Sequence, residues 1–164
     1  MQARRTIRAD VAEVFSATEL RAFRRGDGRI YTVVGHNPDH RLLTDIWLGG
    51  FGSLDNFRAV LDFVCERFEC GGYSYWLADL RHLSESFFEA EEYLARTVVP
   101  RVMAAGMQRE AVVAPALEPG VPQGYDVFGA ADTALRRIAD GRIRGFTDIA
   151  AARAWLLDGN LPGA

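Results

Sequence analysis

The sequence contains no lysine, since all 19 of its basic residues are arginines. A Schiff-base enzyme and a P-loop nucleotide site each need a lysine, so the composition excludes both. Cysteine is almost as scarce. Cys65 and Cys70 are the only two cysteines, and their spacing fits neither a zinc site nor a Cys-x-x-Cys redox motif. We therefore expect two free thiols, with neither a metal nor a cofactor.

Long hydrophobic runs are also missing, and no stretch reaches the length of a transmembrane span. The N-terminal residues include arginines but lack the apolar segment of a secretory signal. The net charge of −3 and the pI of about 5.6 give no overall attraction to nucleic acid or to anionic lipid. We therefore predict a cytoplasmic protein with no nucleic-acid and no membrane partner.

What the sequence does contain is the composition of one globular domain. The chain has 164 residues, of which 49% are hydrophobic and 25% charged. Residues 1–28 are expected to form an N-terminal extension with a short helix capped by Asp10, and residues 29–160 a single domain. The apolar face of that helix would consist of Val11, Val14, Phe15, Leu20 and Phe23.

Periodicity then predicts the elements of the domain. Segments 29–36 and 42–49 have strand composition and flank a turn with Asn37, Pro38 and Asp39, which predicts an antiparallel hairpin. Ser53 is a natural N-cap for the next helix, which Gly71 and Gly72 end. The apolar face of this helix consists of Phe57, Val60, Leu61, Val64 and Phe68.

Strands and helices alternate in the rest of the chain. Strands are predicted at 73–79, 110–115 and 142–146, and each is followed by a helical pattern. Pro100 lies inside the first of these helices and predicts a break near residues 97–99. The order ββαβαβαβα, with right-handed crossovers, predicts an α/β fold whose mixed sheet has an antiparallel N-terminal hairpin followed by parallel βαβ units.

Four segments combine into a more specific pattern: "RLLTDIWLGGFGSLDNF", "YWLADLRHLS", "VVPRVMAAGMQREAVVAP" and "DVFG". They contain a Trp-x-Gly after the second strand, a third strand ending in "WLAD", and a helix with an internal proline. Over about residues 29–158 this pattern resembles a group of small bacterial STAS-like, SpoIIAA-like proteins. The resemblance implies a STAS-like fold, no enzymatic activity, and binding to partner proteins or small ligands.

The resemblance also implies a phosphorylation site. STAS domains that antagonise anti-sigma factors are switched by a serine in a strand-to-helix corner, and the matching corner here is "DLRHLSESFF". Ser84 and Ser86 fall near the switch position. From this position, the resemblance implies that Ser84 or Ser86 is the phosphosite of a regulatory domain. The flanking residues differ from the family pattern, because Glu85 and Phe87 stand where that family has an aspartate and a glycine.

The same corner suggests a site on chemical grounds. A strand ending at Asp79 would bring the carboxyl end of a parallel strand beside a helix N-terminus, where α/β sheets bind ligands and anions. The candidate site residues are Asp79, Arg81, His82, Ser84 and Ser86. Another protein and a small anionic ligand are the expected partners. The structural alternative is that Asp79 accepts hydrogen bonds from backbone amides while a serine caps the helix.

Three functions remain open at this point. The leading hypothesis is a non-enzymatic regulatory or ligand-binding domain. The second is a small hydrolase with His82 as the base beside Ser84 or Ser86 and Asp79 as the orienting acid, although the chain has no G-x-S-x-G elbow. The third is a structural interaction module in which residues 1–28 dock on a partner.

Three weaker features complete the sequence analysis. His36 and His40 bracket a proline turn, which does not align them on one metal as a helix would. The glycines of residues 49–53 match no phosphate-binding loop and predict a turn. A homodimer would cover any strand aromatics that lie on an open face of the sheet. These aromatics are Trp47, Tyr73, Tyr75 and Trp76.

Overall fold

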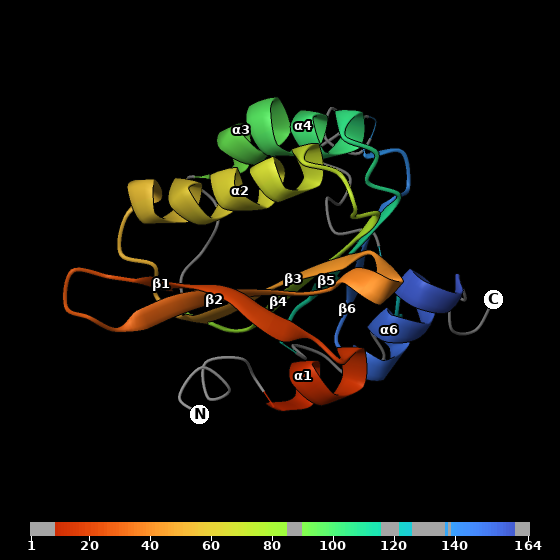
Figure 1. The fold of residues 1–164 in the computed structure, drawn as a ribbon, viewed down its shortest axis with the longest axis horizontal. Coiled ribbons are helices and arrows are strands. Elements are labelled where there is room, and N and C mark those ends of the chain that lie inside the picture. Colours follow the sequence, from red (N-terminus) through yellow and green to blue (C-terminus); the bar gives the residue numbers. More distant parts are fainter. Residues whose placement is uncertain (1–8, 85–89, 116–121, 126–136, 138, 160–164) are drawn as a thin grey trace.

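The structure, a computed structural model, describes residues 9–84, 90–115, 122–125, 137 and 139–159. Within these ranges a mixed six-stranded sheet carries helices on both faces (Figure 1). α2, α3 and α4 lie on one face, and α1 and α6 on the other. The predicted α/β class and mixed sheet are therefore confirmed. No helix in the described ranges is long and apolar enough to cross a membrane.

The strands lie in the sheet in the same order as in the chain. They are β1 (Thr18–Arg24), β2 (Ile30–Asn37), β3 (Leu42–Gly49), β4 (Tyr75–Leu83), β5 (Arg109–Val113) and β6 (Ile143–Phe146). β1, β2 and β3 pair antiparallel, whereas β3, β4, β5 and β6 pair parallel. The predicted hairpin of 29–36 with 42–49 and the parallel arrangement of the later strands are both confirmed.

The predicted short N-terminal helix is present as α1 (Ala9–Phe15). Val11 and Phe15 are buried against the sheet, with exposed fractions of 0% and 1%. The helix ends before Ser16, whose φ of 52° is left-handed and cannot continue it. The Arg153 guanidinium donates a hydrogen bond of 2.9 Å to the carbonyl of Val14, which ties the end of α1 to α6.

The prediction that Leu20 and Phe23 continue this helix is wrong, because both residues lie in β1. β1 pairs with β2 from Thr18 to Arg24, and two register shifts interrupt the pairing. The Phe23 ring packs edge-on against Phe63 of α2, with centroids 5.7 Å apart. Residues 18–24 are therefore an edge strand of the sheet.

α2 (Leu54–Glu69) matches its prediction closely. The Ser53 side chain caps it by accepting a hydrogen bond from the Asn56 N–H, and all five predicted core positions are buried. Gly71 and Gly72 follow the helix with φ of 85° and 99°, a conformation that glycine adopts without strain.

The predicted break near Pro100 is confirmed, and it takes the form of a π-turn. α3 (Glu91–Tyr93) leads into the π-helix η4 (Leu94–Val98), and α4 (Val99–Ala104) then restarts the helix. The Val99 N–H bonds to the carbonyl of Leu94, five residues back. Proline has no N–H to offer to the preceding turn, so the wider turn accommodates it.

Two apolar cores lie on the two faces of the sheet. One lies under α2 and α4 and includes Trp47 and Trp76; the other lies against α1 and α6. α6 (Ile149–Asp158) is capped by Asp148 and ends at Gly159 with φ of 73°. The predicted helix over 126–140 falls almost entirely outside the described residues. The short 3-10 helix η2 (Pro38–His40) connects β2 to β3, and an isolated β-bridge joins Tyr125 to Gly145.

Candidate functional site

Three segments meet at the carboxyl end of the parallel strands: the turn between β1 and β2, the loop between β3 and α2, and the end of β4. The Ser84 N–H donates to the Gly49 carbonyl at 2.9 Å, and Arg25 Nη1 donates to the Gly50 carbonyl at 3.3 Å. Open α/β sheets bind their ligands at this end. It is therefore the candidate site.

Asp79 lies inside β4 rather than at its end, so the predicted strand limit at residue 79 and the predicted corner are wrong. β4 continues to Leu83, and its register with β3 shifts between Asp79 and His82, which indicates a β-bulge. Leu80 and Leu83 pack against the core under α2. This apolar packing explains why a segment with three polar residues stays in the sheet.

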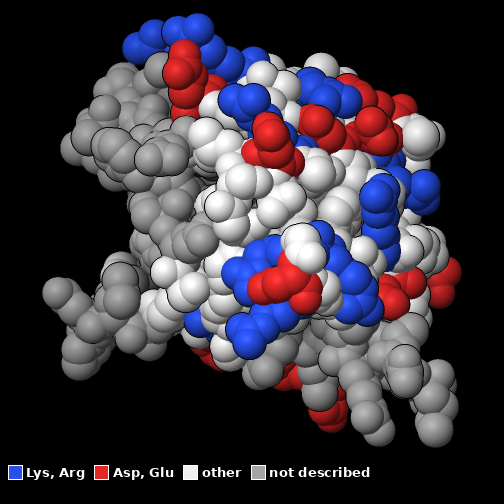
Figure 2. All heavy atoms as spheres, turned by 90° about the vertical axis from the view of Figure 1, so that its left-hand side faces the viewer, with Lys and Arg blue, Asp and Glu red and all other residues white. Residues whose placement is uncertain are grey.

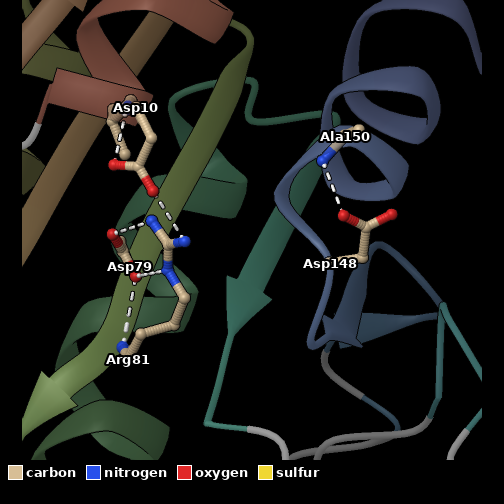
Figure 3. Close-up of polar contacts among 6 residues, drawn as sticks. Asp10, Asp79, Arg81, Asp148 and Ala150 are labelled. Carbon is tan, nitrogen blue, oxygen red and sulfur yellow. Dashed lines mark hydrogen bonds and ion pairs between the residues drawn. The ribbon is translucent and has the colours of Figure 1, made fainter.

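Arg81 joins Asp79 to the N-terminal helix (Figure 3). Its Nε and Nη2 donate to the two carboxylate oxygens of Asp79, each at 2.8 Å, and the Arg81 N–H donates to Oδ1 at 3.1 Å. Arg81 Nη1 lies 2.8 Å from Asp10 Oδ2. We call these three residues the Asp10–Arg81–Asp79 cluster.

The burial of Asp79 and Arg81 shows that this cluster stabilises the fold. The Asp79 side chain is 0% exposed, and that of Arg81 is 19% exposed. The hydrogen bonds to Asp79, and then to Asp10, raise the pKa of the Arg81 guanidinium. A buried carboxylate without such a partner would be strongly destabilising. The structural alternative is therefore correct in part, since Asp79 accepts a hydrogen bond from the backbone N–H of Arg81, but its other two hydrogen bonds come from the Arg81 guanidinium.

The other predicted site residues are placed differently. His82 and Ser84 are exposed, and Ser86 lies outside the described residues. Among the residues that the structure places, no hydrogen bond joins His82 to a serine hydroxyl or to Asp79. The structure thus brings Asp79 and Arg81 together, while His82 and Ser84 remain on the surface at the end of β4.

Asp45, which sequence reasoning missed, is a buried carboxyl group. It lies on the face of the sheet that α2 and α4 cover, opposite the Asp10–Arg81–Asp79 cluster. It is 1% exposed, and its two oxygens accept hydrogen bonds from the indole N–H groups of Trp47 and Trp76. Burial raises the pKa of Asp45 to about 7, although the two indole hydrogen bonds act in the opposite direction. The available signal was a lone acidic residue in the apolar strand segment "LLTDIWLG".

Glu110 is a second buried carboxyl group on this face. It pairs in register with Trp76 of the neighbouring strand and is 7% exposed. Burial, and then the charge of Asp45, raises the pKa of Glu110 well above its ordinary value. Two such carboxyls in one core are unusual, because each must be hydrogen-bonded or neutral there. They are the two carboxyl groups among the described residues whose pKa burial raises.

The histidines of the hairpin turn do not gather acidic or sulfur ligands. His36 Nδ1 lies 2.6 Å from the Tyr73 hydroxyl, and His40 is exposed. Burial, with the nearby charge of Arg67, lowers the pKa of His36. In the described part of the chain, no group of three or more His, Cys, Asp or Glu side chains could hold a metal ion.

An open groove lies over η4 and α4, beside the end of α2. It has a volume of about 560 Å³ and is lined by Glu69, Arg96, Thr97, Pro100, Arg101, Ala104 and Ala105. Its central arginine, Arg101, forms a two-point ion pair with Glu69 and lies 3.7 Å from Asp62. The charges of the groove therefore largely compensate one another.

No family model, no curated protein and no solved structure matches this chain.

Proposed function

We propose that this protein is a non-enzymatic regulatory domain with a STAS-like fold, which binds another protein through the carboxyl end of its parallel strands. One observation carries the proposal. Asp79, the acid best placed for chemistry at that end, is fully buried and held by Arg81. Asp79 therefore has a structural role as the ion-pair partner of Arg81, and it is not positioned to orient a catalytic histidine.

The residues left on the surface support binding rather than hydrolysis. A serine hydrolase needs a hydroxyl within hydrogen-bond reach of its base, and that base oriented by a third group. Among the described residues, His82 has no hydrogen bond to a serine hydroxyl and none to an acidic side chain that could orient it. The mixed sheet, with its antiparallel hairpin ahead of parallel strands, is compatible with the STAS-like resemblance of the sequence.

Ser84 is the proposed regulatory position. It is exposed directly after β4, and its backbone N–H is bonded to Gly49 at the candidate site. A phosphate there would add a negative charge beside the residues that we expect to contact the partner. Phosphate incorporation by a kinase from the same cells should fall in Ser84→Ala. Incorporation that is unchanged in both Ser84→Ala and Ser86→Ala would rule out this switch.

Photo-crosslinking in cells that make the protein tests partner binding. A benzophenone amino acid replaces Ser84 in one version and Arg96, an exposed residue of η4, in the control. We expect a discrete protein adduct from position 84 and none from position 96. Equal adducts from both positions would contradict the proposal. So would turnover of simple ester substrates that disappears in His82→Ala.

A further inference from the structure

The turn between β1 and β2 concentrates positive charge in a protein of net negative charge. Residues 21–29 contain four arginines and one acidic residue, Asp27, whereas the whole chain has a net charge of −3. Figure 2 views the molecule from this end and shows basic side chains surrounding an acidic group near the centre of the face. We call Arg21, Arg24, Arg25 and Arg29 the arginine hairpin.

Contacts within the turn hold its backbone in place. Arg25 Nη2 lies 2.9 Å from Asp27 Oδ2, and its Nη1 reaches the Gly50 carbonyl at 3.3 Å. Arg24 Nη1 donates to the Gly28 carbonyl at 2.9 Å. Gly28 has φ of 85°, which lets the chain reverse. The guanidinium groups are therefore presented on a fixed turn, which lowers the entropy lost on binding.

The four guanidinium groups keep unused donors. The Arg21 guanidinium lies over the Phe23 and Phe63 rings, with its Cζ 4.6 and 5.4 Å from their centroids. Arg29 is exposed, and its side chain makes no hydrogen bond with the described residues. Each guanidinium has five donors arranged to bind carboxylates at two points.

The arginine hairpin lies at the end of the sheet proposed above for partner binding. A Cβ atom on Gly52, just before α2, would be 3.5 Å from Arg25 Cδ, so the turn touches the loop between β3 and α2. The Ser84 N–H is bonded to the carbonyl of Gly49, the last residue of β3 before this loop. The hairpin and Ser84 therefore flank one loop.

We propose that the arginine hairpin binds a short acidic segment of a partner protein. This inference rests on the proposed function and names the chemistry of its partner. A long polyanion fits less well, because α2 beside the hairpin begins with Asp55 in its first turn and carries four acidic residues against two arginines. Nucleic-acid binders carry their basic residues over one face or along a helix, and lipid-binding clusters lie on an amphipathic helix or beside a membrane span, whereas these four arginines lie on one turn between strands. A short run of carboxylates can meet the arginines without reaching the acidic helix.

The test measures fluorescence anisotropy of a labelled peptide of alternating glutamate and serine, added to the full chain. The hairpin variant is Arg24→Gln with Arg29→Gln, two exposed residues. The matched control is Arg58→Gln with Arg96→Gln, two exposed arginines on the helical layer that give the same change in net charge. We expect the hairpin variant to bind at least about tenfold more weakly, and the control to change by less than about twofold.

Each other outcome overturns the inference. An equal loss in both variants would show that net charge alone attracts the peptide. Tighter binding of an oligothymidylate of equal charge, or of vesicles containing phosphatidylserine, would assign the hairpin to another class of partner. If the wild type does not bind the peptide while position 84 still crosslinks a protein, the acidic-segment inference fails and the proposed function stands.

Discussion

Arg81 binds the buried carboxylate of Asp79 at two points, with Nε and Nη2 each 2.8 Å from a carboxylate oxygen. Two-point pairs of this kind are among the strongest hydrogen-bonded contacts in proteins. The two residues lie in the same strand on either side of Leu80. The pair therefore fixes the end of β4, from which the proposed partner-binding surface extends.

Replacing Arg81 by methionine should leave the Asp79 carboxylate buried without its counter-charge. We expect the free energy of unfolding to fall by about 3–5 kcal/mol, because breaking a buried pair from one side is strongly destabilising. Urea denaturation of Arg81→Met measures the loss. The exposed control Arg96→Met should change stability by less than about 0.5 kcal/mol.

Adding Asp79→Asn to this variant removes the unpaired charge. The double variant should therefore be more stable than Arg81→Met alone. A double variant that is less stable by the full sum of the two single losses would contradict the assigned role of Arg81.

Asp45 should make stability depend on pH. Its pKa of about 7 in the folded protein exceeds the ordinary value of 3.8, so the folded state retains a proton that the unfolded state has released. The stabilisation is fully present below about pH 4 and is lost as the pH rises through 7. Glu110, with its raised pKa, acts in the same direction. Asp45→Asn should flatten this slope in part, leaving the contribution of Glu110.

At pH 5 we expect Asp45→Asn to be less stable than the wild type by about 1–3 kcal/mol, because the amide nitrogen cannot accept an indole N–H. Above pH 7 this difference should shrink or reverse, since the variant has no buried charge. Thermal or urea unfolding across pH 4–8 measures both effects, with the exposed Asp55→Asn as the control. An Asp45→Asn profile parallel to that of the wild type would show that Asp45 does not titrate in this range.

Gly145 should not tolerate a side chain. A Cβ atom there would lie 2.3 Å from Cζ and 2.4 Å from Cε2 of Tyr125, whose ring covers this position of β6. We expect Gly145→Ala to lower the free energy of unfolding by about 1–3 kcal/mol through overpacking. In a Tyr125→Ala background the same substitution should cost much less. Equal costs in both backgrounds would disprove the clash as the cause.

Periodicity predicted the elements whose pattern is long. The helix over 54–69 has five apolar positions in register, and no other structure buries them all. Leu20 and Phe23 are only three residues apart, a spacing that fits one helical turn but cannot exclude a strand. These residues form β1 because their backbone pairs with β2 and because the Phe23 ring packs against Phe63. Both partners are distant in sequence, so local pattern could not reveal them.

The site was harder to predict than the fold for the same reason. Asp79 and Arg81 could be named from the sequence, but their third partner, Asp10, lies 71 residues before Arg81 and could not. The polar residues after Asp79 indicated a corner. In the structure, Leu80 and Leu83 pack against the core, and β4 therefore continues to Leu83. Asp45 and Glu110 were visible as acids in apolar strands, but only tertiary packing shows how completely they are buried.

Asp10→Asn tests whether the cluster holds α1 against the sheet. Asp10 is 37% exposed, so its ion pair with Arg81 should contribute no more than about 1 kcal/mol to global stability. The local effect should be clearer, because the hydrogen bond from Arg153 to Val14 secures only the far end of the helix. We expect faster amide hydrogen exchange in residues 11–15 of Asp10→Asn and unchanged exchange in β3. In Arg81→Met the added Asp10→Asn change should have no further effect on α1, since the ion pair between Asp10 and Arg81 is already gone. If Asp10→Asn still accelerates exchange there, α1 is held by contacts of Asp10 other than Arg81.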